Sequence, residues 1–329
     1  MSARAFVFCP GRGSYGREEL GSLRKMLRAG PVAEALQRAD AERSAAGLPA
    51  IAALDAMESF KPGLHLAGIH AAGLIYFATL ASYEQLRTTH KIVGVAGNSL
   101  GWYTALAVAG VLSPYDGWQL VRTMAELQAM VPGGQVLTTA VDADWLPDAA
   151  AQQAIEAALA AVNAAHFAAR SIRLGGHEVL AGTDAGIEAL LRILPKRKVG
   201  EREFPFRLAG HGPFHTVLCN ETAEQALPRV MQLPMRQPEI PLIDGFGRMH
   251  SPWSADPREV LRYTATLQVV ETFDFSACVR GAIREFQPDL LIGCGPGTSL
   301  RAPIGHVVLR EGWRGLRSRD ALFAAGVVR

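Results

Sequence analysis

One serine stands between glycines at the point where an apolar run passes into a run of small residues. The segment is VGVAGNSLGWYTALAVAG, residues 93–110, and Ser99 is its only serine. A G-x-S-x-G turn makes a sharp strand-to-helix reversal that exposes the hydroxyl as a nucleophile. The amide of Leu100, at the start of the predicted helix, would then point toward a developing oxyanion. Ser99 is therefore either a nucleophile or only part of a tight turn.

A nucleophilic serine needs an imidazole close to its hydroxyl. The chain has nine histidines, and two of them stand in GHGPFHTVL, residues 210–218. The Gly-Pro pair predicts a rigid loop that can fix one ring, so we take His215 as the candidate base. An ordinary α/β-hydrolase esterase is the alternative, with Asp289 as the acid residue ahead of His306 as the base. In that scheme His215 would have no catalytic role.

Strand-turn-helix units must position these residues. ARAFVFCPGRG and HKIVGVAGNS predict strands that end in turns, PDLLIGCGPGTSL predicts a later strand, and helical spacing fills the segments between them. The predicted fold class is therefore α/β, with a mostly parallel sheet. The glycine-rich GCGPGTS, residues 293–299, lacks the spacing and the lysine of a phosphate-binding loop, and we interpret it as a turn.

The order of predicted strands and helices changes after residue 134. Strand and helix patterns then follow in the order β-α-β-β-α-β, and REFPFRL forms the last strand. This order is typical of a ferredoxin-like domain. The sequence thus predicts a ferredoxin-like subdomain at 135–208, inserted into a larger body made of residues 1–134 and 209–329.

Composition and charge exclude several classes of protein. The chain of 329 residues is 49% hydrophobic and 19% charged, which is typical of a globular enzyme. Its apolar runs are too short to span a bilayer, and its start does not resemble a signal peptide, so we expect no membrane association and a cytoplasmic location. Lysine and arginine total 33 against 31 acidic residues, with the signs interspersed, and this balance argues against nucleic acid.

The sequence also contains a basic cluster and four widely spaced cysteines. PKRKVGERE, residues 195–203, is a basic cluster that is either a solvated loop or edge, or a contact for an acidic partner. The four cysteines, at positions 9, 219, 278 and 294, form no C-x-x-C pair. We therefore expect buried thiols rather than disulfides, and no metal site.

Four segments stand in one order along the chain: FVFCPGRGS, GNSLGWYTALAVAG, GPFHTVL and IGCGPGTSL. In order and approximate spacing they resemble the malonyl-CoA:acyl carrier protein transacylases, which include the acyltransferase domains of polyketide synthases. The resemblance covers nearly the whole chain. It implies an α/β-hydrolase-like body with a ferredoxin-like subdomain, and an active site in the cleft between them.

The resemblance also implies a ping-pong acyl transfer. Ser99 would take an acyl group from a CoA or carrier thioester, and the phosphopantetheine thiol of an acyl carrier protein would remove it. His215 would act as base and then as acid, oriented by the backbone carbonyl of Gln268. The amides of Arg12 and Leu100 would form the oxyanion hole. No bound cofactor is implied, because the substrates themselves carry CoA or 4′-phosphopantetheine, and we expect a monomer whose partners are acyl-CoA and the carrier.

The chain departs from the family at three places. It has Pro-Gly-Arg-Gly at residues 10–13 where the family has Pro-Gly-Gln-Gly, and Asn98 where a histidine usually precedes the serine. Met124 stands where members that use malonyl groups carry an arginine that holds the free carboxylate. Arg122 is two residues away and faces another side of that helix. We therefore predict that the enzyme is not strictly malonyl-specific.

Two explanations of the acyl pocket remain open. In the first, Met124 supplies an apolar, adaptable lining for an uncharged acyl group. In the second, the Arg12 guanidinium swings into the cleft and holds a carboxylate from the opposite wall. Phe214 either selects small, unbranched extender units, as the same aromatic does in the family, or packs in the cleft floor. With Asn98, these residues make up the predicted substrate pocket.

Two further functions would keep the same fold. A thioesterase would pass the acyl group from the serine ester to water and so hydrolyse the thioester of an acylated carrier protein or of acyl-CoA, as proofreading hydrolases beside polyketide synthases do. A non-catalytic scaffold would only bind a carrier protein. The retention of Ser99, His215 and both oxyanion positions argues against the scaffold.

Overall fold

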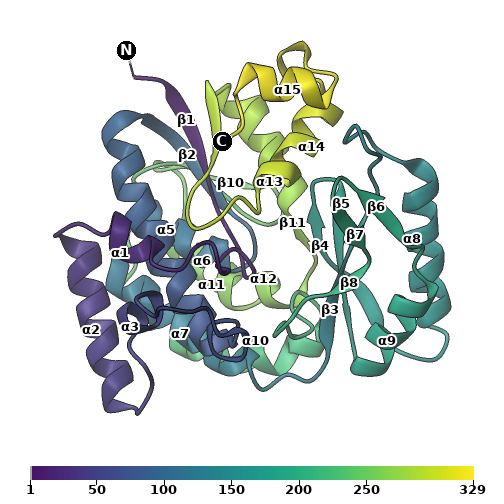
Figure 1. Ribbon diagram of the computed structural model, residues 1–329. Helices are drawn as coiled ribbons and strands as arrows, with labels where there is room; N and C mark the ends of the chain where they lie inside the picture. The colour runs from purple at the N-terminus through teal and green to yellow at the C-terminus, as the bar shows by residue number, and fades with distance from the viewer. Residues whose placement is uncertain (1) are drawn as a thin grey trace.

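The computed structural model describes residues 2–329 as two lobes (Figure 1). The larger lobe, here called the body, contains both termini and a five-stranded, mostly parallel sheet. The smaller lobe contains a second five-stranded sheet and is drawn in teal. The predicted α/β class is confirmed.

The body sheet is built around one buried strand. Strand β1 is buried from Ala5 to Cys9, as expected for an apolar run covered on both faces. It pairs in parallel with β2 and β12, β2 pairs in parallel with β9, and β9 forms an antiparallel pair with β10. The strands of this sheet are β1 (Arg4–Cys9), β2 (Lys91–Gly97), β9 (Leu242–Ile243), β10 (Met249–His250) and β12 (Leu290–Gly293).

Helices cover both faces of the body sheet (Figure 1). The longest, α5, is buried from His70 to Ala81. The helices of the body are α1 (Ser22–Met26), α2 (Pro31–Ala45), α3 (Ile51–Asp55), α4 (Pro62–His65), α5 (Gly68–Thr89), α6 (Leu100–Val108), α7 (Pro114–Gln128), α10 (Asn220–Val230), α11 (Pro257–Ala265), α12 (Leu267–Val270), α13 (Phe275–Gly281), α14 (Arg301–Glu311) and α15 (Arg319–Ala325), with short helical turns at Val217–Cys219, Ala282–Phe286 and Trp313–Gly315.

The smaller lobe has the strand order β4-β5-β3-β8, in which every neighbouring pair is antiparallel. This is the order of a ferredoxin-like sheet, and helices α8 and α9 pack on it through a core of their own. Strand β11 of the body extends the sheet, because it pairs in parallel with β4. The elements are β3 (Gly134–Thr139), α8 (Ala149–Val162), β4 (Ala168–Leu174), β5 (His177–Gly182), α9 (Asp184–Ile193), β8 (Phe206–Arg207) and β11 (Phe273–Asp274).

The prediction of one strand across REFPFRL is wrong. The segment forms two strands, β7 (Arg202–Phe204) and β8, and Pro205 separates them. Proline has no N–H to donate to a strand ladder, so pairing stops there. Strand β7 pairs instead with β6 (Arg197–Val199), so the basic cluster forms a short two-stranded hairpin.

The structure also bears on the cysteines and on the membrane question. All four cysteines are buried and unpaired, which confirms the expectation of buried thiols. Among residues 2–329, none of the helices has both the length and the apolar character that a bilayer-crossing segment needs.

Candidate active site

The turn that carries Ser99 depends on two glycines. A Cβ atom at Gly97 would lie 2.1 Å from the backbone of Gly101, and one at Gly101 would lie 2.0 Å from the carbonyl oxygen of Cys9. Only glycine allows the end of β2, the start of α6 and the end of β1 to approach so closely. The turn leaves Ser99 with φ 56°, a left-handed conformation that a serine rarely adopts. Ser99 is thus held in a strained turn.

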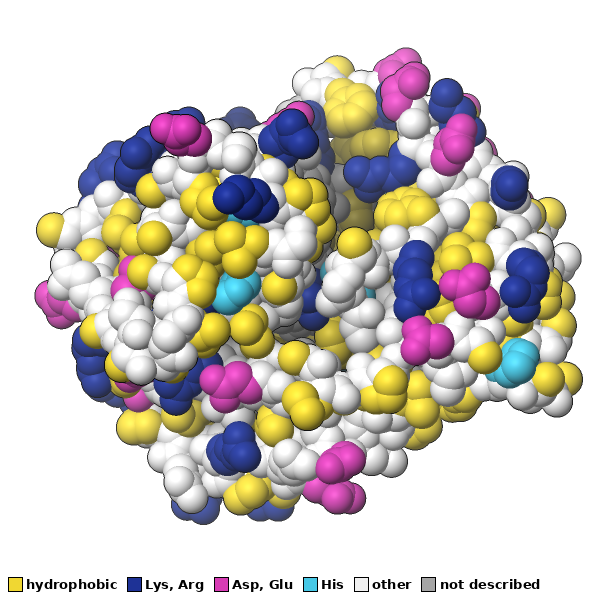
Figure 2. Space-filling view, turned by 60° about the horizontal axis from the view of Figure 1, so that its bottom comes forward, with side chains coloured by type: hydrophobic (Ala, Val, Ile, Leu, Met, Phe, Trp, Pro, Cys, Tyr) yellow, Lys and Arg dark blue, Asp and Glu magenta, His cyan; other side chains and the backbone are white. Residues whose placement is uncertain are grey.

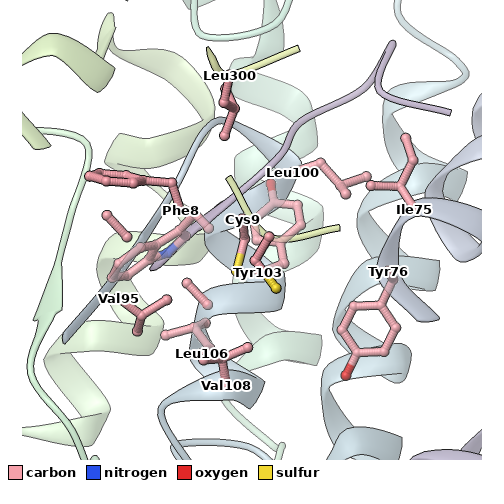
Figure 3. Packing of buried hydrophobic residues seen from close by; sticks show 14 of the residues in the cluster. Phe8, Cys9, Ile75, Tyr76, Val95, Leu100, Tyr103, Leu106, Val108 and Leu300 are labelled. Carbon is pink, nitrogen blue, oxygen red and sulfur yellow. The ribbon is translucent and has the colours of Figure 1, made fainter. Parts of the chain in front are cut away.

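Helix α6 is fixed against the sheet by a buried apolar cluster. Figure 3 shows Leu100, Tyr103 and Leu106 of this helix gathered with Phe8 and Val95 of the strands. The tight packing explains how the strain at the turn is maintained.

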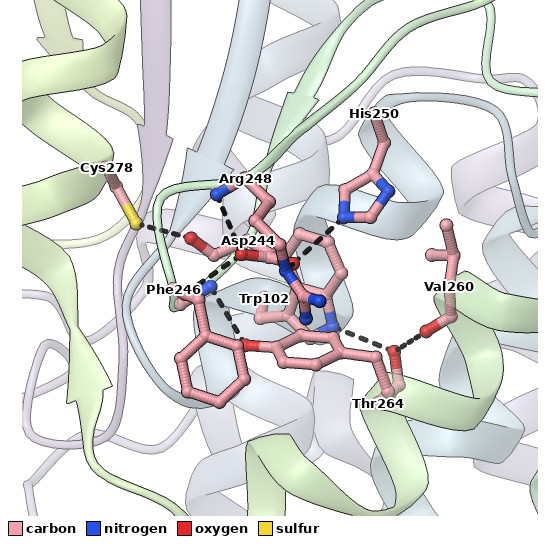
Figure 4. Close-up of polar contacts among 10 residues, drawn as sticks. Trp102, Asp244, Phe246, Arg248, His250, Val260, Thr264 and Cys278 are labelled. Carbon is pink, nitrogen blue, oxygen red and sulfur yellow. Dashed lines mark hydrogen bonds and ion pairs between the residues drawn. The ribbon is translucent and has the colours of Figure 1, made fainter. Parts of the chain in front are cut away.

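A buried polar cluster lies where α6 meets α11 and the loop between β9 and β10 (Figure 4). Trp102 Nε1 donates a hydrogen bond of 2.8 Å to Thr264 Oγ1 on α11. Beside it, the buried carboxylate of Asp244 accepts from Arg248 Nε at 3.1 Å and from His250 Nε2 at 3.0 Å. These residues do not line the cavity beside Ser99, so we assign them a structural role in holding α6.

Ser99 and His215 meet as the sequence predicts. Ser99 Oγ lies 2.8 Å from His215 Nε2, and His215 Nδ1 lies 2.6 Å from the backbone oxygen of Gln268. Because a carbonyl oxygen can only accept, Nδ1 carries the proton, and the lone pair of Nε2 faces the serine hydroxyl. This tautomer is the one that a general base needs.

Burial sets the protonation state of the base. The His215 ring is buried, and desolvation lowers its pKa to about 4, although the hydrogen bond to the Gln268 carbonyl opposes this effect. The imidazole is therefore neutral at physiological pH and ready to accept the proton of Ser99.

Residues from both lobes hold the His215 loop. The His215 amide donates to the carbonyl of Val269 at 3.0 Å. From the smaller lobe, Ser171 Oγ donates to the Phe214 carbonyl at 2.8 Å, and Gln135 Nε2 donates to Ser171 Oγ at 2.7 Å. Ser171 and Gln135 are not predictable from the sequence, because no motif or spacing connects their segments to the His215 loop.

Gln268 does more than its backbone contact. Its side-chain oxygen accepts from the Tyr103 hydroxyl at 2.9 Å, and its amide donates to the Ser99 carbonyl at 3.3 Å. The same residue therefore links the base, the nucleophile and α6. The role of Tyr103 was also missed, since its helical position predicts only core packing.

The two predicted oxyanion donors are free. The backbone amides of Arg12 and Leu100 donate to no acceptor within residues 2–329. Leu100 is the first residue of α6, where an N–H has no partner inside the helix. Both amides are therefore available to a ligand.

A cavity of about 810 Å³ opens beside Ser99 and lies between the lobes. Arg12, Asn98 and Phe214 line it, as predicted. Met124 does not belong to the lining; it is 1% exposed and packs in the core of the body. Met124 faces the core from α7, and its side chain therefore does not contribute to the wall of this cavity.

Arg12 places a charged side chain on the cavity wall. Its guanidinium donates to the carbonyls of Gly210 and Leu66 and lies 5.4 Å from the centre of the Phe214 ring. It forms no ion pair within residues 2–329, and its buried Nε has no acceptor. Desolvation lowers its pKa to about 10. Arg12 therefore stays charged and is unmatched by any carboxylate of the chain.

Arg122 faces away from this cavity, in agreement with its predicted side of the helix. Its guanidinium pairs with Glu42 at 3.2 Å and with Glu126 at 3.9 Å. It is therefore already neutralised and does not replace the missing family arginine.

The structure does not bring together the residues that the esterase alternative requires. His306 is buried, and its Nδ1 accepts from the Gly176 amide at 3.0 Å. Asp289 instead accepts from the Arg4 amide at 2.8 Å and pairs with Arg314 at 3.6 Å. Among residues 2–329, no acid therefore orients His306 toward Ser99.

The basic hairpin is partly neutralised by the chain itself. Arg197 pairs with Asp148 at 2.6 Å, and Lys198 pairs with Glu201 at 3.7 Å. This arrangement favours the solvated interpretation of the cluster over a contact for an acidic partner.

Known proteins share this fold and part of the sequence. No family model matches the chain. A malonyl CoA-acyl carrier protein transacylase of Bacillus subtilis is 29% identical over 170 residues, which are 50% of this chain and 50% of that protein. An acyl-carrier-protein S-malonyltransferase of Burkholderia pseudomallei superposes with a TM-score of 0.74 at 24% identity, over 93% of each chain. The chain is related to the malonyl-CoA:acyl carrier protein transacylases.

Another solved transacylase was captured with its partner. It is a malonyl-transacylase in complex with a type II polyketide synthase acyl-carrier protein, with a TM-score of 0.72 at 20% identity, and the match covers 93% of this chain and 92% of that one. At this identity the likeness establishes a common fold. The matched segment spans about half the length of the Bacillus transacylase.

We predict that the reactivity of Ser99 is nearly independent of pH from 8 to 5. Because the pKa of His215 is lowered to about 4, the base stays neutral across this range. A histidine with an ordinary pKa near 6.5 would instead be mostly protonated at pH 5, and the rate would fall about 30-fold. The measurement is the rate of labelling by a fluorophosphonate probe at each pH, and a fall of that size would contradict the lowered pKa.

Proposed function

We propose that this protein is a serine acyltransferase that moves an acyl group from a thioester to the phosphopantetheine thiol of an acyl carrier protein. The observation that carries the proposal is the contact between Ser99 and a buried His215 whose free nitrogen faces the hydroxyl. Its position beside a large cavity and the relation to transacylases support the choice of a thioester substrate.

The first half-reaction forms an acyl-serine ester. Ser99 Oγ attacks the thioester carbonyl carbon while His215 Nε2 takes the hydroxyl proton. The amides of Arg12 and Leu100 bind the oxygen of the tetrahedral intermediate. The carbon–sulfur bond then breaks, and His215 returns the proton to the departing thiolate.

The second half-reaction repeats these steps with a new thiol. His215 removes the proton from the carrier's phosphopantetheine thiol, and the sulfur attacks the ester carbonyl carbon. The bond to Ser99 Oγ breaks, and the proton on His215 restores the serine hydroxyl. Since one chain supplies the nucleophile, the base and both amides, we propose that a monomer is sufficient for the reaction. We also propose that the donor is acyl-CoA and that the enzyme acts in the cytoplasm.

Partition between thiol and water tests the transfer. We expect purified protein given acetyl- or malonyl-CoA and a holo acyl carrier protein to accumulate acyl carrier, with free acid below about a tenth of the product. The same carrier without its phosphopantetheine arm is the control and should remain unacylated. Mass spectrometry of the carrier and chromatography of the acid provide the measurement. If free acid were the main product, the protein would be a thioesterase rather than a transferase.

The acyl group that we propose carries a free carboxylate. Arg12 supports this, because its guanidinium lines the cavity, stays charged and has no carboxylate partner within residues 2–329. A carboxylate at this position would add a charge-assisted hydrogen bond, which contributes about 1.5–3 kcal/mol. This choice favours the second of the two explanations of the pocket over an uncharged acyl group packed on Met124.

The ratio of two donors tests this choice. We expect Arg12→Gln to lower the ratio of kcat/KM for malonyl-CoA to that for acetyl-CoA by about tenfold or more, since only malonyl loses a charged partner. The ratio cancels any effect on the backbone amide of residue 12, which both donors use. An unchanged ratio would remove Arg12 as the carboxylate partner and restore the uncharged pocket.

A further inference from the structure

The wall of the cavity carries unbalanced positive charge. Four arginines line it, and none forms an ion pair within residues 2–329. The acidic residue of the lining, Glu19, already accepts from the amide of Gly16 at 2.8 Å. Figure 2 shows Lys and Arg side chains along the edges of the hollow between the lobes. The four residues are Arg12, Arg202, Arg301 and Arg319.

Two of these arginines lie together at the end formed by α14 and α15. The guanidinium of Arg301 is 5.1 Å from the centre of the Phe323 ring, and that of Arg319 is 5.7 Å from the same centre. The Trp145 ring is 5.3 Å from the Phe323 ring and completes an aromatic wall. Both cations therefore belong to the same part of the cavity wall, and each would attract a bound anion there.

Buried donors without acceptors mark the same region. His306 is 3% exposed, and its Nδ1 accepts from Gly176, so the proton of the neutral ring is on Nε2. That N–H has no partner within residues 2–329. The Ser14 hydroxyl, on a residue 3% exposed, and Arg319 Nε are likewise buried without a partner. All three residues line the cavity, and a buried donor without an acceptor costs about 1–3 kcal/mol.

The backbone adds to the positive electrostatic potential at this end of the cavity. Helix α14 begins at Arg301, and the residues before it, Thr298 and Ser299, line the cavity together with its first turn. The positive end of the helix dipole therefore faces the cavity beside Arg301 and Arg319. The turn GCGPGTS thus leads into this region, although it has no phosphate-loop spacing.

We propose that Ser14, Arg301, His306 and Arg319 form an anion subsite that binds a phosphate ester on the pantetheine arm of the substrate. A phosphate supplies both the negative charge and the several acceptor oxygens that this set lacks. The inference rests on the proposed function, since a thioester on a pantetheine arm has its phosphate at the end opposite the reacting sulfur. The contacts of Ser99 and His215 are with other residues, so this subsite is separate from the reacting atoms.

Two sources share this chemistry. The 4′-phosphate occurs both in CoA and in the phosphopantetheine of a carrier protein, whereas the 3′-phosphate and the second phosphate of the pyrophosphate occur in CoA alone. A series of CoA, 4′-phosphopantetheine and pantetheine separates them.

Equilibrium binding to the Ser99→Ala protein tests the subsite without turnover. We expect pantetheine to bind at least tenfold more weakly than CoA, and Arg301→Gln to reduce that ratio about tenfold, as measured by calorimetry. The side chain of Arg301 is exposed and makes no hydrogen bond within residues 2–329, so we expect its replacement to leave the fold intact. Arg319→Lys keeps the charge while losing the planar donor set. Arg258→Gln, an exposed arginine of α11 outside the cavity, is the matched control and should leave the ratio unchanged.

The outcomes are distinct. Tighter binding of both CoA and 4′-phosphopantetheine than of pantetheine supports a site for the shared 4′-phosphate. Tighter binding of CoA alone would overturn that site, because the nucleotide phosphates would then be the bound groups. Equal affinity for CoA and pantetheine, or an equal loss for both in Arg301→Gln, overturns the subsite. Failure of the proposed function would show separately, as absence of acylation of folded, unsubstituted protein by any thioester while the difference in affinity persists.

Discussion

The close approach of three backbone segments governs this active site. Gly101 lies so near the Cys9 carbonyl that any side chain larger than hydrogen would separate α6 from β1. This contact fixes the turn that gives Ser99 its positive φ and sets Leu100 at the first position of the helix. The hydroxyl, the free amide and the direction of α6 all follow from it.

The second requirement is a dry, oriented base, and the two lobes supply it together. The Gln268 carbonyl from the body fixes the tautomer of His215, while Ser171 and Gln135 from the smaller lobe hold the adjoining Phe214 carbonyl. Burial lowers the pKa of the ring and keeps it neutral. Desolvation also lowers the pKa of Arg12 on the cavity wall, and an anionic ligand would offset the cost of burying that charge.

The local parts of this arrangement are predictable from sequence, and the long-range parts are not. Ser99 is recognisable because glycine spacing encodes the turn, and His215 because a Gly-Pro loop carries it. Gln268 follows from the family resemblance alone. Ser171 and Gln135 escape prediction because strand pairing, not sequence distance, brings them to the loop. Pro205 divides an apparently continuous strand, a break that the flanking aromatic residues conceal.

The acyl pocket shows the limit of alignment most clearly. Met124 aligns with a substrate-binding position of the family, yet it packs in the core, and the cavity wall instead carries the guanidinium of Arg12. A position in an alignment gives the place along a helix, whereas the surroundings decide whether the side chain reaches the substrate.

The most direct test of the account is the intact mass of the protein after brief exposure to malonyl-, acetyl- and longer acyl-CoA. The account predicts an adduct of one acyl group on the unsubstituted protein and on His166→Ala, an exposed histidine outside the cavity, and no adduct on Ser99→Ala. An adduct that persists in Ser99→Ala, or no adduct on the folded, unsubstituted protein from any of these donors or from an acyl carrier thioester, would contradict it.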